Sequence, residues 1–282
     1  MLRVALPNKG QLAEPARDML REAGYLRSHH PRDLVVQDPD NDAEFFFLRP
    51  RDIATYVGSG TLDVGITGRD MLIDSGAAAT ELMTLGFGGS TFRLAVPVGQ
   101  VTGGIDVIAG KRVATSYPGL LSAWLANNNI EAHLIKLEGA VENAVQLGVA
   151  DAVADVVDTG TTLRQAGLAV IGAPILQSEA VLIRRVGAPS ARSVDTFLRR
   201  LEGVIVARTY VMVDYDVPLE LVSQAVAITP GIESPTVSPL HDSKWAAVRA
   251  MVPRRDVHSV MDDLHDLGAK GVIVTDIHAA RL

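Results

Sequence analysis

Short apolar runs alternate with amphipathic segments over the first two thirds of the chain, and this rhythm constrains the fold more than any other feature. Short apolar runs bounded by turn residues indicate strands, whereas a period near 3.6 residues indicates helices. The alternation therefore predicts α/β architecture. Strands are predicted at 2–6, 44–48, 62–67, 112–116, 133–137, 152–157 and 181–184, and helices at 14–23, 51–57, 120–127, 141–147 and 193–206.

Two of the predicted strands resemble each other. LDVGITG (62–68) and VADAVAD (149–155) both carry an acidic residue early in an apolar strand, and both follow a helix and precede a polar turn. We interpret them as matching strands in two similar lobes that face a cleft. Buried strands resemble one another in general, so the pattern also fits two unrelated strands.

The rhythm changes after about residue 209. Strands are predicted at 209–213, 234–239, 246–252 and 271–275, with helices at 219–227 and 256–267. The resulting order, βαββαβ, is that of a ferredoxin-like domain. By analogy with other enzymes, a small domain in this place binds a regulator or mediates oligomerisation.

Composition excludes several classes of protein. A chain of 282 residues can hold two domains, or three small ones. The absence of cysteine excludes a disulfide framework and thiolate metal sites, and it fits a reducing compartment. A net charge of −7 argues against a general nucleic-acid binder. No run approaches the roughly 20 apolar residues of a membrane helix, and the first residues lack the apolar region of a signal peptide. We therefore expect a cytoplasmic protein that does not bind membranes.

The segment ENAVQLGVADAVADVVDTGTTL (142–163) carries the clearest indication of function. An apolar strand ends in Asp155 and Asp158 and is followed by a Thr-Gly-Thr-Thr turn that opens a helix. Free backbone N–H groups at such a turn bind anions, and Gly160 lets the backbone approach a phosphate closely. The two carboxylates then suit the hydroxyls of a ribose phosphate. In the alternative interpretation, Thr159 only caps the helix and the aspartates are solvated.

Basic residues follow other predicted strands, at the edge where open α/β sheets bind ligands. Lys9 follows the first strand, Arg49 and Arg51 follow the strand at 44–48, and Arg69 follows the strand at 62–67. Lysine is a mobile positive charge suited to a pyrophosphate or triphosphate, and arginine can bind phosphate with two N–H groups. Taken singly, each could equally be a surface or structural residue. Together they predict an anionic ligand.

Two further observations concern aromatic and metal-binding side chains. Tyr117 is a candidate to stack on adenine, although a satisfied edge tyrosine fits as well. The seven histidines show no spacing typical of metal ligands. We therefore predict no metal held by protein side chains, and we expect Mg²⁺ to arrive with a pyrophosphate group.

The acidic-acidic-Thr-Gly turn is similar to the phosphoribosyl pyrophosphate loop of phosphoribosyltransferases in general. The longer spacing, from Glu142 through Gly148 and Asp155 to Leu163, resembles the signature of ATP phosphoribosyltransferases in particular. PNKG (7–10), LDVGITG (62–68) and ITPGIESPT (228–236) resemble segments of the long form of that family. The resemblance covers essentially the whole chain.

The resemblance implies that N1 of the adenine ring of ATP attacks C1 of phosphoribosyl pyrophosphate, and that magnesium pyrophosphate leaves. Lys9, with nearby arginines, is expected to steady the pyrophosphate. Either Glu142 or Asp155 is expected to stabilise the cationic sugar. Binding of phosphoribosyl pyrophosphate is expected at Asp155, Asp158, Thr159, Gly160, Thr161, Thr162 and Leu163. ATP or its anionic groups are expected at Lys9, Arg49, Arg69 and Tyr117.

The resemblance also implies an organisation and a regulation. Two lobes like those of periplasmic binding proteins are expected, lobe I at 1–90 and 179–207 and lobe II at 91–178, followed by a ferredoxin-like regulatory domain at 208–282. Histidine and AMP are expected inhibitors, and the chain is expected to form homo-oligomers from dimer to hexamer. The histidine site is expected to include Asp216, Ile232, Ser234, Thr236 and Gly271. A proline-rich connector whose hydroxyls cap local turns is the alternative for 228–239.

Two other classes of protein remain open at this point. Paired lobes also occur in bacterial solute-binding proteins, although the acidic Thr-Gly turn argues against that class. An enzyme like prephenate dehydratase also has two lobes and a small regulatory domain. Glu233-Ser234-Pro235 fits its characteristic element only in part, and the phosphate turn would have no explanation.

Overall fold

The computed structural model describes residues 1–26, 33–157 and 160–281. The chain divides into two units, one formed by Met1–Asp18 with Leu26–Val194 and the other by Met19–Tyr25 with Asp195–Leu282. In the described residues, none of the helices combines the length and the apolar character that crossing a bilayer requires.

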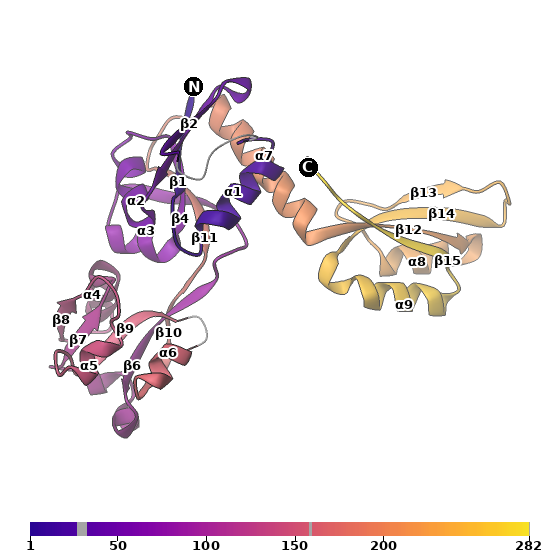
Figure 1. The fold of residues 1–282 in the computed structure, drawn as a ribbon. Coiled ribbons are helices and arrows are strands. Elements are labelled where there is room, and N and C mark those ends of the chain that lie inside the picture. Colours follow the sequence, from indigo (N-terminus) through magenta and orange to yellow (C-terminus); the bar gives the residue numbers. More distant parts are fainter. Residues whose placement is uncertain (27–32, 158–159, 282) are drawn as a thin grey trace. The chain divides into compact units, whose positions relative to one another are not determined.

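The first unit contains two mixed sheets, each with its own helices (Figure 1). The sheet of lobe I has the order β2-β3-β1-β4-β11-β5. Its strands are β1 (Leu2–Pro7), β2 (Val35–Asp38), β3 (Ala43–Leu48), β4 (Val64–Gly68), β5 (Ala79–Thr84) and β11 (Ala180–Arg185), and its helices include α2 (Pro50–Gly58) and α3 (Arg69–Ser75), with α1 (Ala13–Glu22) following β1. The buried faces of Ile53, Ala54 and Val57 in α2 pack against this sheet.

The sheet of lobe II has the order β10-β6-β9-β7-β8. Its strands are β6 (Ser90–Pro97), β7 (Arg112–Thr115), β8 (His133–Lys136), β9 (Ala152–Val157) and β10 (Leu168–Ser178), and its helices are α4 (Pro118–Asn127), α5 (Asn143–Gln146) and α6 (Thr161–Gln165), with a 3₁₀ segment at Val98–Ile108. Separate apolar clusters cover the two faces of the sheet, one with α4 and the other with α5 and α6. The strands are therefore buried on both sides, which explains their continuous apolar character.

The two lobes repeat one topology. In lobe I, β3, β1 and β4 are parallel and are followed by antiparallel β11 and β5; in lobe II, β8, β7 and β9 are parallel and are followed by antiparallel β6 and β10. β4 and β9 occupy the same place in this order, as the sequence repeat predicted.

The acidic residue of the repeat has one structural role in both lobes. Asp63 accepts a hydrogen bond from the backbone N–H of Arg3 at 2.8 Å, and Asp151 accepts one from the N–H of Arg112 at 3.0 Å. Each carboxylate therefore begins the pairing between two parallel strands. This structural role accounts for Asp63 and Asp151 without a ligand.

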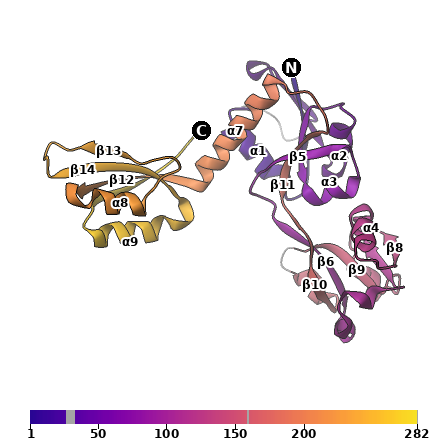
Figure 2. The same ribbon diagram turned by 180° about the vertical axis from the view of Figure 1, so that it is seen from behind.

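Four strands in the first unit had no counterpart in the sequence prediction: β2, β5, β6 and β10. β6 and β10 run antiparallel side by side (Figure 2), and their register shifts between Ile171 and Leu176. The Gly-Ala-Pro sequence at 172–174 interrupts the strand pattern there, which explains why β10 was not predicted.

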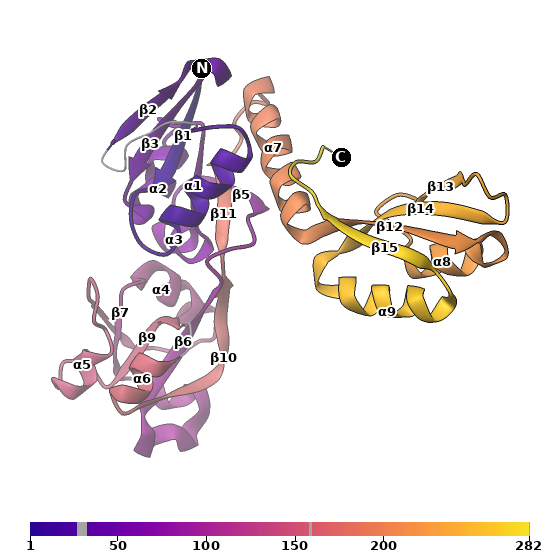
Figure 3. The same ribbon diagram turned by 45° about the vertical axis from the view of Figure 1, so that its right-hand side comes forward.

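The second unit contains α7 (Arg192–Thr209) and a four-stranded antiparallel sheet of order β13-β14-β12-β15. The other elements are β12 (Tyr210–Pro218), α8 (Val222–Ile228), β13 (Thr236–Pro239), β14 (Trp245–Pro253), α9 (Val257–Leu267) and β15 (Lys270–Asp276). Both α8 and α9 cover one face of the sheet (Figure 3). Residues of β12 alternate strictly between buried and half-buried, so one face of this strand forms the core. The predicted class, a two-lobed α/β region followed by a βαββαβ domain, is confirmed.

Candidate active site

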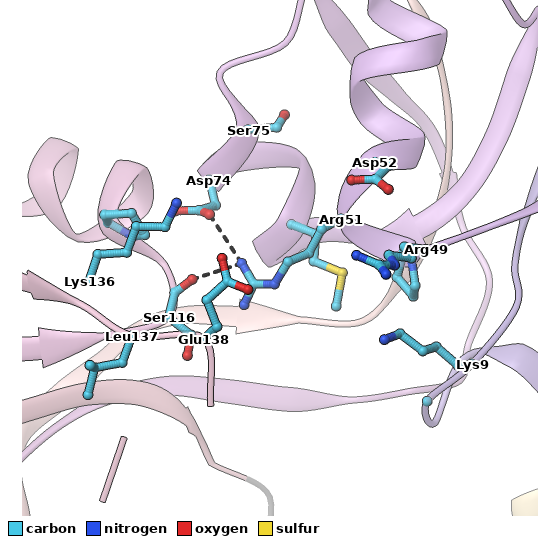
Figure 4. Close-up of a pocket in the computed structure, with 14 residues that line it drawn as sticks. Lys9, Arg49, Arg51, Asp52, Asp74, Ser75, Ser116, Lys136, Leu137 and Glu138 are labelled. Atoms are coloured by element: carbon cyan, nitrogen blue, oxygen red, sulfur yellow. Dashed lines mark hydrogen bonds and ion pairs between the residues drawn. The ribbon is translucent and has the colours of Figure 1, made fainter. Parts of the chain in front are cut away.

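A cavity of about 510 Å³ lies within the first unit and takes residues from both lobes (Figure 4). Four of the lining side chains are cationic and three are carboxylates. The residues that line it are Lys9, Gly10, Arg49, Pro50, Arg51, Asp52, Met71, Asp74, Ser75, Ser116, Pro118, Lys136, Leu137 and Glu138. The cavity brings together Lys9 and Arg49, two of the predicted anion-binding residues.

Lys9 and Arg49 lie at the carboxyl ends of two adjacent parallel strands. Lys9 follows β1, and Arg49 follows β3 and precedes α2. Because the segments that follow β1 and β3 both leave the sheet at its carboxyl edge, the side chains of Lys9 and Arg49 line the same cavity. Both are exposed, and neither makes an ion pair with another described residue. They are therefore available to an anion.

Arg51 links the lobes rather than standing free in the cavity. Its Nη1 donates to the backbone oxygen of Ser116 at 2.8 Å and lies 3.4 Å from a carboxylate oxygen of Asp74. Its guanidinium carbon lies 4.3 Å from the centre of the Tyr117 ring, within the range of a cation–π contact.

Asp74 of lobe I caps a helix of lobe II. Its Oδ1 accepts hydrogen bonds from the backbone N–H groups of Gly119, at 2.8 Å, and Leu120, at 3.1 Å, in the first turn of α4. A Cβ at position 119 would lie 2.3 Å from the backbone oxygen of Asp74, so only glycine permits this approach. The cap, together with Arg51, holds α4 against α3.

Tyr117 lies between these groups and is only 6% exposed. The Arg51 guanidinium faces its ring, and the Phe92 ring meets it edge-on at 5.4 Å between centroids. Burial raises the pKa of its phenol, and the negative charge and hydrogen bond of Asp70 raise it further. Arg51 therefore covers one face of the Tyr117 ring, and the predicted stacking of adenine on this ring stays a prediction.

Asp155 projects from β9 into a cluster of charged groups. Its Oδ1 accepts a hydrogen bond from the backbone N–H of Val156 at 2.8 Å. Burial raises the pKa of this carboxyl to about 6, and the negative charges of Glu142 and Asp70 contribute to the rise, while the N–H of Val156 and the charge of Arg51 oppose it. Burial and the neighbouring negative charges make the ionised form of Asp155 energetically unfavourable. Carboxyl groups with a pKa shifted in this way are often found in catalytic or binding sites.

Asp70 was not predicted as a site residue. It is 4% exposed and shares two hydrogen bonds with Ser178: the Ser178 hydroxyl donates to Asp70 Oδ1 at 2.8 Å, and the N–H of Asp70 donates to that hydroxyl at 3.0 Å. No local signal marks it, because Ser178 lies far along the chain at the end of β10.

Arg69 lies away from the cavity lining, and its guanidinium is already paired. It donates to both carboxylate oxygens of Glu81, at 2.8 and 2.9 Å, and to Glu179 at 3.4 Å. A fourth hydrogen bond goes to the backbone oxygen of Gln177 at 3.1 Å. The structure thus gives Arg69 a bracing role between β5 and the segment that joins β10 to β11, and its predicted contact with ATP stays a prediction.

The predicted phosphate turn is described only in part, because Asp158 and Thr159 lie outside the described residues. Gly160 adopts a left-handed conformation, φ 71° and ψ 10°, and precedes α6. Thr161 and Thr162 are exposed, whereas Leu163 is 6% exposed and packs in the core of lobe II. The predicted contact of Leu163 with a ligand stays a prediction. Gly160 and Leu163 also line a second cavity of about 510 Å³ with Thr91, Arg93 and Arg164.

The residues that the structure describes contain no group of three histidine, aspartate or glutamate side chains arranged to hold a metal ion.

Comparison with known proteins decides the family. The family model described as ATP phosphoribosyltransferase matches residues 49–203, and the model described as HisG, C-terminal domain, matches residues 207–279. The chain belongs to the ATP phosphoribosyltransferase family.

Relatives and a solved structure agree with this assignment. An ATP phosphoribosyltransferase of Arthrobacter sp. (strain FB24) is 59% identical, and one of Streptomyces coelicolor is 57% identical, each over 100% of both chains. A solved ATP phosphoribosyl transferase (HisG:HisZ) complex from Thermotoga maritima contains a chain that is 28% identical, with a TM-score of 0.63; the match covers 73% of this chain and 98% of that one. This ATP phosphoribosyltransferase is of the long form, and it is a pentosyltransferase. The assignment to a solute-binding protein or a prephenate dehydratase is excluded.

The C-terminal domain of this ATP phosphoribosyltransferase has a cavity of its own, also of about 510 Å³. Three predicted histidine-binding residues line it: Asp216 from β12, Thr236 from β13 and Gly271 from β15. The other two, Ile232 and Ser234, precede β13 and are not among the lining residues. Gly271 has φ 60°, and a Cβ there would come within 3.9 Å of Asp216 Oδ2.

Proposed function

We propose that the chain joins the phosphoribosyl group of phosphoribosyl pyrophosphate to N1 of the adenine of ATP, releases pyrophosphate, and is inhibited by histidine. The observation that carries the reaction is the cavity in which Lys9 and Arg49 are unpaired among the described residues, with Asp155 nearby in the same unit. Both substrates are polyphosphates, and the sugar becomes cationic as pyrophosphate leaves. The cationic side chains of Lys9 and Arg49 suit the polyphosphates, and the carboxylate of Asp155 suits the cationic sugar.

Positioning and electrostatics are the chemistry required of the protein, because the adenine nitrogen is itself the nucleophile. Lys9 and Arg49 bind the leaving pyrophosphate and offset its growing negative charge. Gly160 and the first turn of α6 hold the 5′-phosphate of the ribose. Asp155, with Glu142 beside it, stabilises the positive charge that develops on the sugar.

Mg²⁺ enters this scheme as part of the substrate. It is bound to the pyrophosphate when the substrate arrives and keeps several of its waters, as is usual for this ion. The carboxylates of Asp52 and Glu138 line the same cavity and could accept hydrogen bonds from those waters.

A pyrophosphate-release assay tests the reaction. Release should require both ATP and phosphoribosyl pyrophosphate, and the product should carry the ribose on N1 of adenine by mass spectrometry and NMR. Release with either substrate alone, or a product substituted elsewhere, would contradict the proposal.

Organisation and assembly form a further part of the proposal. Residues 1–90 with 179–207 and residues 91–178 act as the two catalytic lobes, and residues 208–282 form the regulatory domain. The chain works in the cytoplasm as a homo-oligomer, dimer to hexamer, and AMP competes at the catalytic site.

Histidine inhibition is proposed to act through the cavity of the C-terminal domain. Asp216 supplies an anion for the ammonium or imidazolium group, and Thr236 supplies a hydroxyl and a backbone N–H for the carboxylate. The cavity also contains Arg249, which is paired with Asp214 at 2.6 Å. Inhibition requires histidine to bind one state of the enzyme better than another.

Replacing Asp216 and Thr236 together by alanine should raise the histidine concentration for half-inhibition at least about tenfold, or about 1.4 kcal/mol of binding. Turnover without histidine should persist. The matched control replaces Ser259 and Asp262, both exposed on α9, by alanine and should keep the wild-type inhibition curve. Equal inhibition curves for the two double variants would mean that the regulator binds elsewhere.

A further inference from the structure

Lys136 is the cation that lobe II contributes to the cavity between the lobes. It is the last residue of β8, which runs parallel to β7, with Lys136 opposite Thr115. The next residue continues the ladder, since the N–H of Leu137 donates to the backbone oxygen of Thr115 at 3.0 Å. The strand pairing therefore fixes Lys136 at the carboxyl edge of the lobe II sheet, the counterpart of the edge at which Lys9 and Arg49 lie in lobe I.

The side chains of Lys9 and Arg49 lie on one side of the cavity and that of Lys136 on the other, with Arg51 between them (Figure 4). Like Lys9 and Arg49, Lys136 is exposed and has no ion-pair partner among residues 1–26, 33–157 and 160–281. Several cations around one cavity repel one another and together attract an anion.

The carboxylates in the same wall offset these charges only in part, because the lining holds four cations and three carboxylates. Asp74 is engaged by Arg51 and by two N–H groups of α4. Asp52 lies in the first turn of α2, where the helix dipole favours a negative charge. Glu138 remains, and it can accept hydrogen bonds from the water shell of a bound Mg²⁺.

We propose that Lys136 binds a polyphosphate group of the substrates and, with Lys9 and Arg49, bridges it between the two lobes. The cavity volume, about 510 Å³, is in the range of small-ligand sites. A chain of phosphates presents charge at several points, so it can meet cations on both walls at once, which a single phosphate cannot. The identity of the polyphosphate, the triphosphate of ATP or the pyrophosphate group of phosphoribosyl pyrophosphate, rests on the proposed function.

Calorimetric titration of the full chain with inorganic tripolyphosphate tests the site independently of the reaction. Lys136→Met should weaken this binding at least about tenfold, and Lys136→Arg should restore it to within about threefold of wild type. The control is Lys111→Met: Lys111 is also exposed in lobe II but precedes β7, at the opposite edge of the sheet. The Lys111→Met variant should bind tripolyphosphate with the affinity of the wild type.

Titration with the two substrates then distinguishes the source of the polyphosphate. If the cavity takes the triphosphate, Lys136→Met loses affinity for ATP and keeps that for phosphoribosyl pyrophosphate; if it takes the pyrophosphate group, the loss is reversed. Tripolyphosphate binding by Lys136→Met within about twofold of wild type would overturn the proposal, as would a wild-type chain that binds no tripolyphosphate. A wild type that binds tripolyphosphate through Lys136 but forms no pyrophosphate would instead contradict the proposed reaction alone.

Discussion

Replacing Gly160 by valine should weaken the binding of phosphoribosyl pyrophosphate by at least about 100-fold, close to 2.7 kcal/mol, while the fold persists. Gly160 has φ 71°, a conformation that a β-branched residue rarely adopts. A Cβ at this position would lie 3.6 Å from a methyl group of Val157, an ordinary contact, so no clash with the protein arises at the Cβ. The damage is therefore expected at the surface where the phosphate must approach the backbone. Calorimetric titration with phosphoribosyl pyrophosphate measures it.

The same helix provides a control for backbone strain. Gly167 follows α6 with φ 72° and has nothing within 4 Å of its Cβ position, so Gly167→Val introduces similar strain at the other end of the helix. This variant should bind phosphoribosyl pyrophosphate within about threefold of wild type. If both variants lose binding equally, strain in lobe II is responsible and Gly160 has no special place at the phosphate.

Local patterns were sufficient to predict the elements that have one clear period. α9 ends at Gly268 in a left-handed conformation and was predicted within one residue of its observed bounds. β12 alternates between core and surface and was predicted at 209–213, but it continues to Pro218. β9 and its counterpart β4 were recognised because each is a short apolar run after a turn. The same method missed β10, because the Gly-Ala-Pro sequence at 172–174 interrupts its pattern, and it also missed the neighbouring strand β6.

Partners that lie far apart in the sequence could not be predicted. Arg69 and Lys9 follow strand ends in the same manner, yet the structure pairs Arg69 with Glu81 and Glu179 and leaves Lys9 unpaired among the described residues. The cap that Asp74 places on α4 spans 45 residues and has no local signature. Lys136 could have been found, because it ends a parallel strand just as Lys9 follows one.

Replacing Asp155 by asparagine should lower kcat by at least about 100-fold, or about 2.7 kcal/mol of transition-state stabilisation. The carboxylate must be ionised to stabilise a cationic sugar. Since burial raises its pKa to about 6, kcat/KM of the wild type should fall as the pH drops through about 6. In Asp155→Asn this acidic limb should disappear from what activity remains. Rates measured across this pH range with both substrates provide the test.

The sign of the effect on stability separates this role from a structural one. The pKa of Asp155 is raised from 3.8 to about 6 on folding, so its contribution to stability is full below its unfolded pKa and is lost as the pH rises through about 6. At about pH 8 the ionised carboxylate therefore destabilises the fold, and Asp155→Asn should raise the free energy of unfolding by an amount on the order of 1–3 kcal/mol. Asp151→Asn, just before the same strand, removes a carboxylate that Arg112 holds at a pKa of about 2. That control should lose stability and keep the acidic limb. An Asp155→Asn enzyme that is less stable at about pH 8, or that retains the limb near 6, would contradict a catalytic charge at this position.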